Sequence, residues 1–150
     1  AYRGPVAEAV AGAERLGAAA AHRLWAAGEA AFVDVLPRPE KPKDLPPDVV
    51  WRDTPRDSIP GALWAPNTGY GALDPGRHAY LRAVLARATG GDRAAPVVLF
   101  CLRDCWMSWN AAKRAATEYG YARVYWYPDG TDGWAEAGHP LTRVEPAPRP

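Results

Sequence analysis

The sequence is poor in the residues that bind metals or cross membranes. Its 150 residues include two cysteines and three histidines. A single cysteine pair does not make a structural zinc site, and His22, His78 and His139 have no ligand spacing. No apolar stretch approaches the roughly 20 residues that span a bilayer. The 18 basic and 17 acidic residues leave a net charge of +1, which favours neither nucleic acid nor an anionic membrane. We therefore expect no metal, no cofactor, no nucleic-acid partner and no membrane span.

Phenylalanine is also scarce, with two residues against seven tryptophans and seven tyrosines. Trp and Tyr carry polar groups that favour the rims of sites and interfaces over a pure core, so we expect several of them to line a site or a docking face. The length fits one domain over residues 1–150, large enough to bury a core without disulfides or metal. The two cysteines therefore point to chemistry.

Both cysteines lie where an apolar run meets a helical pattern. The run Val97–Phe100 predicts a strand buried on both faces, and Cys101 follows it directly. Ligands bind at the carboxyl ends of such strands, and loop N–H groups with the next helix lower a cysteine pKa there. We expect Cys101 to be the nucleophile and Cys105 its partner thiol. The alternative is a pair of buried, inert cysteines.

Strand and helix patterns alternate along the chain. They predict helices over residues 11–27, 78–88 and 108–119, the last with Ser108 as its N-cap, and strands over residues 31–36, 59–66, 97–100 and 123–127. This alternation predicts an α/β domain with a mainly parallel central sheet and helices on both faces. Residues 128–133 read as a turn.

Two segments are rich in proline and lack periodicity. The first, about residues 37–57, is a loop of a length that is usually functional or packed over a site. The second is the polar end of the chain after Arg143.

The order of several motifs resembles the rhodanese-like family over roughly residues 16–141. Val33-Asp34-Val35 matches the family's early strand with its aspartate, and Ser58–Ala62 looks like its His-Ile-Pro-Gly-Ala turn, with Ser58 where histidine is common. The run ending at Cys101 corresponds to the strand before the family's active cysteine, and residues 133–141 look like its terminal stretch. The resemblance implies a rhodanese-like fold and a sulfurtransferase-like or thiol-redox activity.

Two segments resemble a narrower group, the CXXCW-motif proteins associated with pyrroloquinoline-quinone (PQQ)-dependent catabolism. They are residues 105–115 and 126–134. The resemblance implies a periplasmic protein, its signal peptide removed, that assists quinoprotein alcohol oxidation, often in methylotrophs. The implied partner is a PQQ-dependent dehydrogenase or its cytochrome. The group's name places two residues between the cysteines, whereas this chain has three.

The loop departs from ordinary rhodaneses. Their loop closes with an arginine that holds an anion, and Met107 stands at that position here. We therefore expect low thiosulfate sulfurtransferase activity and no phosphatase activity, although small sulfur species remain candidate substrates. Arg103 either points inward and binds an anion or lies in solvent. Asp34, at an adjacent strand end, is expected to orient the loop.

The remaining candidates are aromatic or depend on the loop's shape. We expect Ser108 and four tryptophans to border the cysteine site, the alternative being ordinary packing of helix on sheet: Trp64, Trp106, Trp109 and Trp134. A disulfide needs Cα atoms roughly 4.4–6.8 Å apart, which a curled loop of this length supplies with some strain. Three functions stay open: sulfur transfer through a Cys101 persulfide, dithiol–disulfide exchange, and a binding module that has lost the chemistry.

Overall fold

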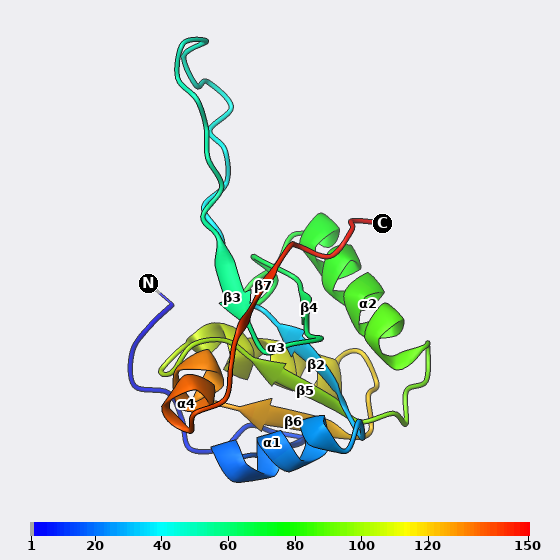
Figure 1. The fold of residues 1–150 in the computed structure, drawn as a ribbon. Helices are drawn as coiled ribbons and strands as arrows, with labels where there is room; N and C mark the ends of the chain where they lie inside the picture. The colour runs from blue at the N-terminus through cyan, green and yellow to red at the C-terminus, as the bar shows by residue number, and fades with distance from the viewer. Residues whose placement is uncertain (1) are drawn as a thin grey trace.

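A five-stranded parallel sheet forms the centre of the computed structural model, which describes residues 2–150 (Figure 1). The strand order is β1-β6-β5-β2-β4. The strands are β1 (Ala13–Arg15), β2 (Ala31–Asp34), β4 (Leu63–Trp64), β5 (Val97–Phe100) and β6 (Val124–Tyr127). β3 (Arg56–Ser58) and β7 (Thr142–Val144) form a separate antiparallel pair. The helices are α1 (Ala18–Ala26), α2 (Pro75–Thr89), α3 (Trp106–Thr117) and α4 (Gly130–Glu136).

Helices cover both faces of the sheet, which confirms the predicted fold class. α2 and α3 pack on one face and α1 and α4 on the other (Figure 1). β5 is the central strand, and all four of its residues are fully buried because a helix layer covers each face. Alternate side chains therefore enter opposite layers: Leu99 and Cys101 join the α2/α3 layer, and Val98 and Phe100 join the α1/α4 layer.

Three helix boundaries differ from the sequence prediction for local reasons. α2 begins at Pro75, earlier than expected, because the Asp74 side chain caps it by accepting a hydrogen bond from the Arg77 N–H at 2.8 Å. α3 begins at Trp106 with Cys105 as its N-cap. Residues 128–133, predicted as a turn, instead contain the first turn of α4. None of the helices described within residues 2–150 is long and apolar enough to cross a membrane.

The prediction of one helix over residues 11–27 was wrong. Residues 13–15 form β1, which pairs in parallel with β6 from Ala13 opposite Val124 to Arg15 opposite Trp126. The helix starts only after the Gly17 N-cap. Alanine favours helix, but the unpaired edge of β6 offers hydrogen bonds that outweigh a weak local preference.

The long proline-rich segment projects away from the body of the molecule (Figure 1). We call residues 37–55, between β2 and β3, the projecting loop. The side chains of Val49 and Val50 are 47% and 75% exposed. At its base, Asn67 accepts a hydrogen bond from the Arg38 N–H and donates one to the Arg38 carbonyl, both at 3.0 Å. The middle of this loop is therefore free for contact with another molecule.

Backbone hydrogen bonds hold the polar end of the chain to the body of the molecule. This end follows β7, and the Ala147 N–H donates to the Trp64 carbonyl at 2.7 Å. The Tyr80 hydroxyl donates to the Ala147 carbonyl at 2.6 Å. The backbone partners of this end of the chain, in β3 and β4, lie far away in sequence.

Candidate functional site

The two cysteines form a disulfide at the carboxyl end of β5. Their Cα atoms are 6.3 Å apart, inside the expected range. Cys101 is fully buried and Cys105 is 2% exposed. Cys101, the nucleophile expected from the sequence, is therefore oxidised and closed to solvent in this structure. We call residues 101–105 the cysteine loop.

The beginning of α4 forms one wall of the cysteine loop. The Thr131 N–H donates to the Cys101 carbonyl at 3.0 Å, and the Arg103 N–H donates to the Asp132 carboxylate at 3.0 Å. Gly130 lies so close that a Cβ atom there would collide with the carbonyl oxygen of Cys101. This close approach explains why the position needs glycine.

The amino end of α3 forms the other wall. Cys105 caps the helix with an extended backbone and no side-chain hydrogen bond. Because the sulfurs are bonded to each other, both lie near this end, where backbone N–H groups stabilise a thiolate. Ser108, expected to cap the helix, is instead buried within it. Its hydroxyl donates to the Cys105 carbonyl at 3.3 Å and accepts from Trp126 Nε1 at 3.0 Å.

The Arg103 side chain points to α4. Its guanidinium donates two hydrogen bonds to Glu136, at 2.8 and 2.6 Å, and lies 3.5 Å from Asp129. The hydrogen bonds from Arg103 lower the pKa of Glu136, and the same contact with Glu136 raises the pKa of Arg103. The positive charge of Arg103 is thus paired with carboxylates of α4 and its N-cap. An arginine that binds an anion at the site would instead point at the sulfurs.

Asp34 lies near the cysteine loop but on the other face of the sheet. Its buried carboxylate accepts hydrogen bonds from Arg56 Nε at 2.7 Å, from Ser58 Oγ at 2.6 Å and from the Leu36 N–H at 3.0 Å. Arg56 in turn donates to Thr131 Oγ1 at 3.2 Å. Hydrogen bonds through Arg56 and Thr131 therefore connect Asp34 to the backbone carbonyl of Cys101. This connection does not involve the Cys101 sulfur.

Sequence reasoning missed Arg56. It is 6% exposed, and its Nη2 atom, like the hydroxyl of Tyr127, is buried without a hydrogen-bond partner among residues 2–150. Burial raises the pKa of Tyr127 to about 12, and the negative charge of Asp129 adds to the shift. The available signal was position in the sequence, because Arg56 lies two residues before Ser58, where the family-like turn begins.

The structure brings two of the four predicted tryptophans to the cysteine loop. Trp106 and Trp109 pack edge to face, with ring centroids 5.1 Å apart, at the beginning of α3. Trp64 is 2% exposed and donates to the Leu36 carbonyl at 2.8 Å, so it is a core residue. Trp134 is 1% exposed and packs on Trp25 in the α1/α4 layer, on the face away from the cysteine side chains.

Two tyrosines that the sequence analysis did not select take the place of these tryptophans. Tyr2 and Tyr70, together with Trp106, Met107 and Asn110, line a cavity of about 380 Å³ beside the beginning of α3. Tyr2 lies far from this helix in sequence, so no local pattern indicates the contact. The aromatic border of the site therefore comes from three distant segments.

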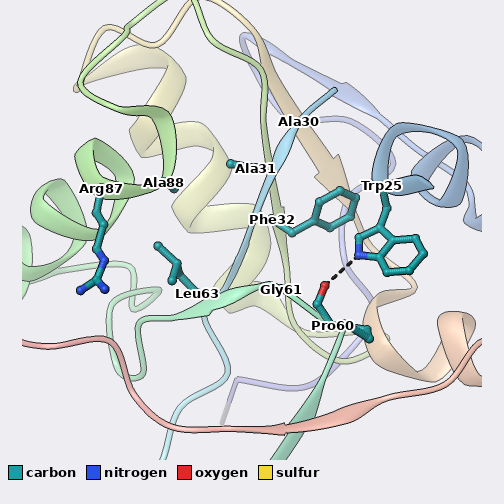
Figure 2. Close-up of a pocket in the computed structure, with 9 residues that line it drawn as sticks. All are labelled: Trp25, Ala30, Ala31, Phe32, Pro60, Gly61, Leu63, Arg87 and Ala88. Atoms are coloured by element: carbon teal, nitrogen blue, oxygen red, sulfur yellow. Dashed lines mark hydrogen bonds between the residues drawn. The ribbon is translucent and has the colours of Figure 1, made fainter. Parts of the chain in front are cut away.

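A separate cavity of about 410 Å³ lies at the amino end of β2 (Figure 2). Trp25 forms one side and donates from Nε1 to the Pro60 carbonyl at 2.7 Å, while Phe32 and Leu63 add apolar surface. The cysteine loop lies at the opposite, carboxyl end of the neighbouring strand β5. This cavity is therefore not part of the cysteine site.

The histidines do not form a metal site in the described part of the chain. His22 and His139 stack with centroids 3.7 Å apart and planes at 5°, which joins α1 to the segment after α4. Over residues 2–150, no group of three or more His, Cys, Asp or Glu side chains is arranged to hold a metal ion.

Comparison with known proteins agrees with this architecture. The sequence pattern of the family described as "Rhodanese-like domain" matches residues 17–137. A thiosulfate sulfurtransferase from Pseudomonas aeruginosa superposes with a TM-score of 0.56 at 20% identity, covering 89% of this chain and 21% of that one. The polysulfide-sulfur transferase homodimer from Wolinella succinogenes superposes with a TM-score of 0.53 at 23% identity, covering 87% of this chain and 79% of that one.

No curated protein sequence matches this chain significantly. The chain spans about a fifth of the Pseudomonas enzyme, and at these identities the two structures establish the fold alone. The family pattern, by contrast, covers most of the chain and includes the cysteine loop, β5 and the strands beside it. The chain belongs to the rhodanese-like domain family.

Proposed function

We propose that this protein exchanges the Cys101–Cys105 disulfide with a pair of thiols on a partner protein. The observation that carries the proposal is the disulfide itself, which occupies the position expected for the family's nucleophile. A persulfide on Cys101 needs that sulfur to be free, so the oxidised state excludes sulfur transfer until the bond is reduced. Met107 in place of an anion-holding arginine further weakens the sulfur-transfer alternative.

The exchange balances as a two-electron reaction. A partner thiolate attacks Sγ of Cys105, the less buried of the two residues, and the disulfide electrons leave with Cys101 as a thiolate. The partner's second thiolate then attacks its own sulfur in the mixed disulfide, and Cys105 leaves as a thiolate. The partner is oxidised to a disulfide, this protein is reduced to a dithiol, and the two protons from the partner thiols pass through solvent.

Mass spectrometry and a redox titration test this function. We expect the native mass to rise by two hydrogens on reduction, and a midpoint potential above about −300 mV, below which structural disulfides resist reduction. A native mass increased by one sulfur atom would instead favour the persulfide. A potential far below that limit would make the bond a structural brace. Turnover of thiosulfate should stay well under about 10 per second.

Single-cysteine variants assign the two sulfurs. We expect the Cys105→Ser variant, which keeps Cys101, to be alkylated faster at neutral pH than an ordinary thiol of pKa about 8.5, because N–H groups at the amino end of α3 stabilise the thiolate. The Cys101→Ser variant, which keeps Cys105 as a free thiol, should trap a mixed disulfide with the disulfide form of the partner: the Cys105 thiolate attacks one partner sulfur, the other leaves as a thiolate, and no second thiol of this protein resolves the bond. Unperturbed alkylation of Cys101 would remove it as the leaving thiolate.

We further propose that the exchange takes place in the periplasm and assists PQQ-dependent alcohol oxidation. The support is the resemblance of residues 105–115 and 126–134 to the CXXCW-motif group. The proposed partner is a quinoprotein dehydrogenase or its cytochrome. Fractionation of producing cells, and trapping of a mixed disulfide between the Cys101→Ser variant and the disulfide form of the purified dehydrogenase or cytochrome, test both parts. A cytoplasmic protein that traps neither would contradict them.

A docking module without chemistry is the second candidate. One observation favours it: the projecting loop extends away from the body of the molecule (Figure 1), and its residues Val49 and Val50 are exposed to solvent. If this candidate is correct, a Val49→Ser, Val50→Ser variant loses affinity for the purified dehydrogenase or cytochrome, while a variant with both cysteines changed to serine binds normally. The opposite pattern selects disulfide exchange.

A further inference from the structure

The cysteine loop is covered by the segment Tyr2–Gly4, which we call the N-terminal strap. The Gly4 N–H donates to the Asp104 carbonyl and the Trp106 N–H donates to the Tyr2 carbonyl, both at 2.8 Å. These two bonds make an antiparallel bridge in which Arg3 stands opposite Cys105. The strap therefore pairs with the loop as one strand pairs with another.

The conformation of the loop creates this pairing edge. Cys105 has an extended backbone, with φ −113° and ψ 114°, and Asp104 adopts a left-handed φ of 55° that turns the chain just before it. The carbonyl of Asp104 and the N–H of Trp106 then face the same side. Such an edge can pair with an extended peptide of any sequence, because backbone groups make the hydrogen bonds. Side-chain contacts then determine which peptide is preferred.

The register places one strap residue against a cysteine. In an antiparallel pair flanked by hydrogen bonds of this kind, the facing residues are the non-hydrogen-bonded pair, whose Cα atoms are closest, about 4.5 Å apart. Arg3 holds this position, and its guanidinium is anchored 2.9 Å from the Arg103 carbonyl and 3.7 Å from Asp132. A cysteine in the place of Arg3 would bring its sulfur next to Cys105.

The residue before that position meets an aromatic surface. Tyr2 lies between two cavities of about 410 and 380 Å³ and borders both together with Tyr70. One cavity continues to Trp106 and Met107, and the other to Pro37 and Asn67 at the base of the projecting loop. Removal of the Tyr2 ring would open a single groove, suited to the aromatic side chain of another peptide.

We propose that the 104–106 edge is the docking site for an extended partner segment with an aromatic residue directly before its reacting cysteine. The strap occupies this site as an intramolecular competitor and keeps Cys105 covered. This proposal rests on the proposed disulfide exchange and names the recognition step for it. The covalent step is the attack of the docked thiolate on Sγ of Cys105, with Cys101 leaving as a thiolate.

Reduction kinetics with short peptides test the docking site. The probes are Ser-Tyr-Cys-Gly-Ser and Ser-Gly-Cys-Gly-Ser in excess, so that a second peptide thiol resolves the mixed disulfide and leaves a peptide disulfide and the reduced protein. The Gly4→Pro variant, which lacks the N–H that bonds to Asp104, releases the strap in the full chain. Glu29→Ala, a change at an exposed residue between α1 and β2, is the control.

We expect the Gly4→Pro variant to be reduced by the tyrosine peptide about tenfold faster than wild type, and the glycine peptide to react at least fivefold more slowly than the tyrosine peptide. A non-thiol strap peptide, Ala-Tyr-Arg-Gly-Pro, added in trans should slow the reaction again. The Glu29→Ala rate should equal that of wild type.

The alternative outcomes separate the two proposals. If both peptides and dithiothreitol accelerate equally in Gly4→Pro, the strap is only a cover and the docking site is refuted. If Gly4→Pro reacts like wild type, the strap does not control access. If no thiol reduces the disulfide even after strap release, the proposed exchange itself fails, whatever the strap does. Thermal unfolding of each variant confirms that it is folded.

Discussion

Two loops that follow neighbouring strands differ in what holds them. The cysteine loop leaves β5 and the projecting loop leaves β2, and these strands lie side by side in parallel. α4 and the N-terminal strap hold the backbone of the cysteine loop through the Cys101 carbonyl, the Arg103 N–H and the Asp104 carbonyl. The projecting loop is held near its base, and from residue 41 to 50 every side chain except that of Leu45 is exposed.

This difference shows where each loop's conformation comes from. Backbone polar groups that leave water need partners, and the cysteine loop finds them on distant segments. The projecting loop keeps its backbone in water, so its own prolines and turns determine its path. Changes around the cysteine loop should therefore be costly, and changes in the projecting loop should not.

The largest effect is expected at the buried ion pair that supports the cysteine loop. Asp34→Asn leaves the Arg56 guanidinium buried without its counter-charge, which typically costs about 3–5 kcal/mol. Denaturant unfolding measures this loss. Asp57→Asn is a matched control, since Asp57 also lies 2.7 Å from an arginine, Arg143, but both are exposed and the expected loss is under about 1 kcal/mol. Equal losses would show that burial does not set the cost.

The second-largest loss of stability is expected at Gly130, where α4 packs against the cysteine loop. Gly130→Ala introduces a Cβ against the Cys101 carbonyl and a side chain at φ 54°, so we expect a loss of about 3 kcal/mol. Gly138→Ala, with φ 87° and open space, isolates the backbone strain and should cost about 1 kcal/mol. The denaturant midpoints of the two variants measure the difference in stability. Identical midpoints would mean that α4 shifts to accommodate the Cβ atom at no cost.

A smaller effect, a gain in stability, is expected at Tyr127 beside the cysteine loop. Tyr127→Phe removes a buried hydroxyl without a partner and should stabilise the fold by about 1 kcal/mol at neutral pH. Tyr80→Phe removes a hydroxyl that donates to Ala147 and should cost about as much. Loss of stability in Tyr127→Phe would indicate that this hydroxyl is bonded in solution.

Tyr127 also makes the free energy of unfolding depend on pH in the alkaline range. Burial raises its pKa in the folded state to about 12, whereas an unfolded chain has a tyrosine pKa of about 10. The neutral form is therefore favoured by folding, and the associated stability is complete below pH 10 and is lost as the pH rises toward 12. Unfolding curves between these values should fall less steeply for Tyr127→Phe than for wild type.

The smallest effect is expected in the projecting loop. Replacement of residues 41–50 by two glycines removes exposed residues and shortens the loop, so the free energy of unfolding should stay equal or rise by up to about 1 kcal/mol. The reduction rate of the disulfide should not change. A loss above about 2 kcal/mol would show that this loop, like the cysteine loop, depends on tertiary contacts.

The elements with a local sequence pattern were predictable without any knowledge of the fold. A continuous apolar run suffices for β5, because a strand covered on both faces has no polar side to present. α2 was predicted from its helical spacing and from the glycines after it. The alternation of strands and helices predicted the parallel sheet, and the order of motifs led to the family. Cys101 at the strand end followed from the same reasoning.

The set of residues around the cysteine loop, in contrast, depends on how the whole chain folds. α4 and the N-terminal strap contact it directly, Arg56 supports it through Thr131, and no local sequence spacing predicts these contacts between distant segments. Residues 13–15 became a strand because β6 offered an open edge. Trp134 became core because the layer that a side chain enters depends on how α4 packs, not on its neighbours in sequence. Local patterns report which face of an element is apolar, whereas the partner for that face is set by the chain's path through space.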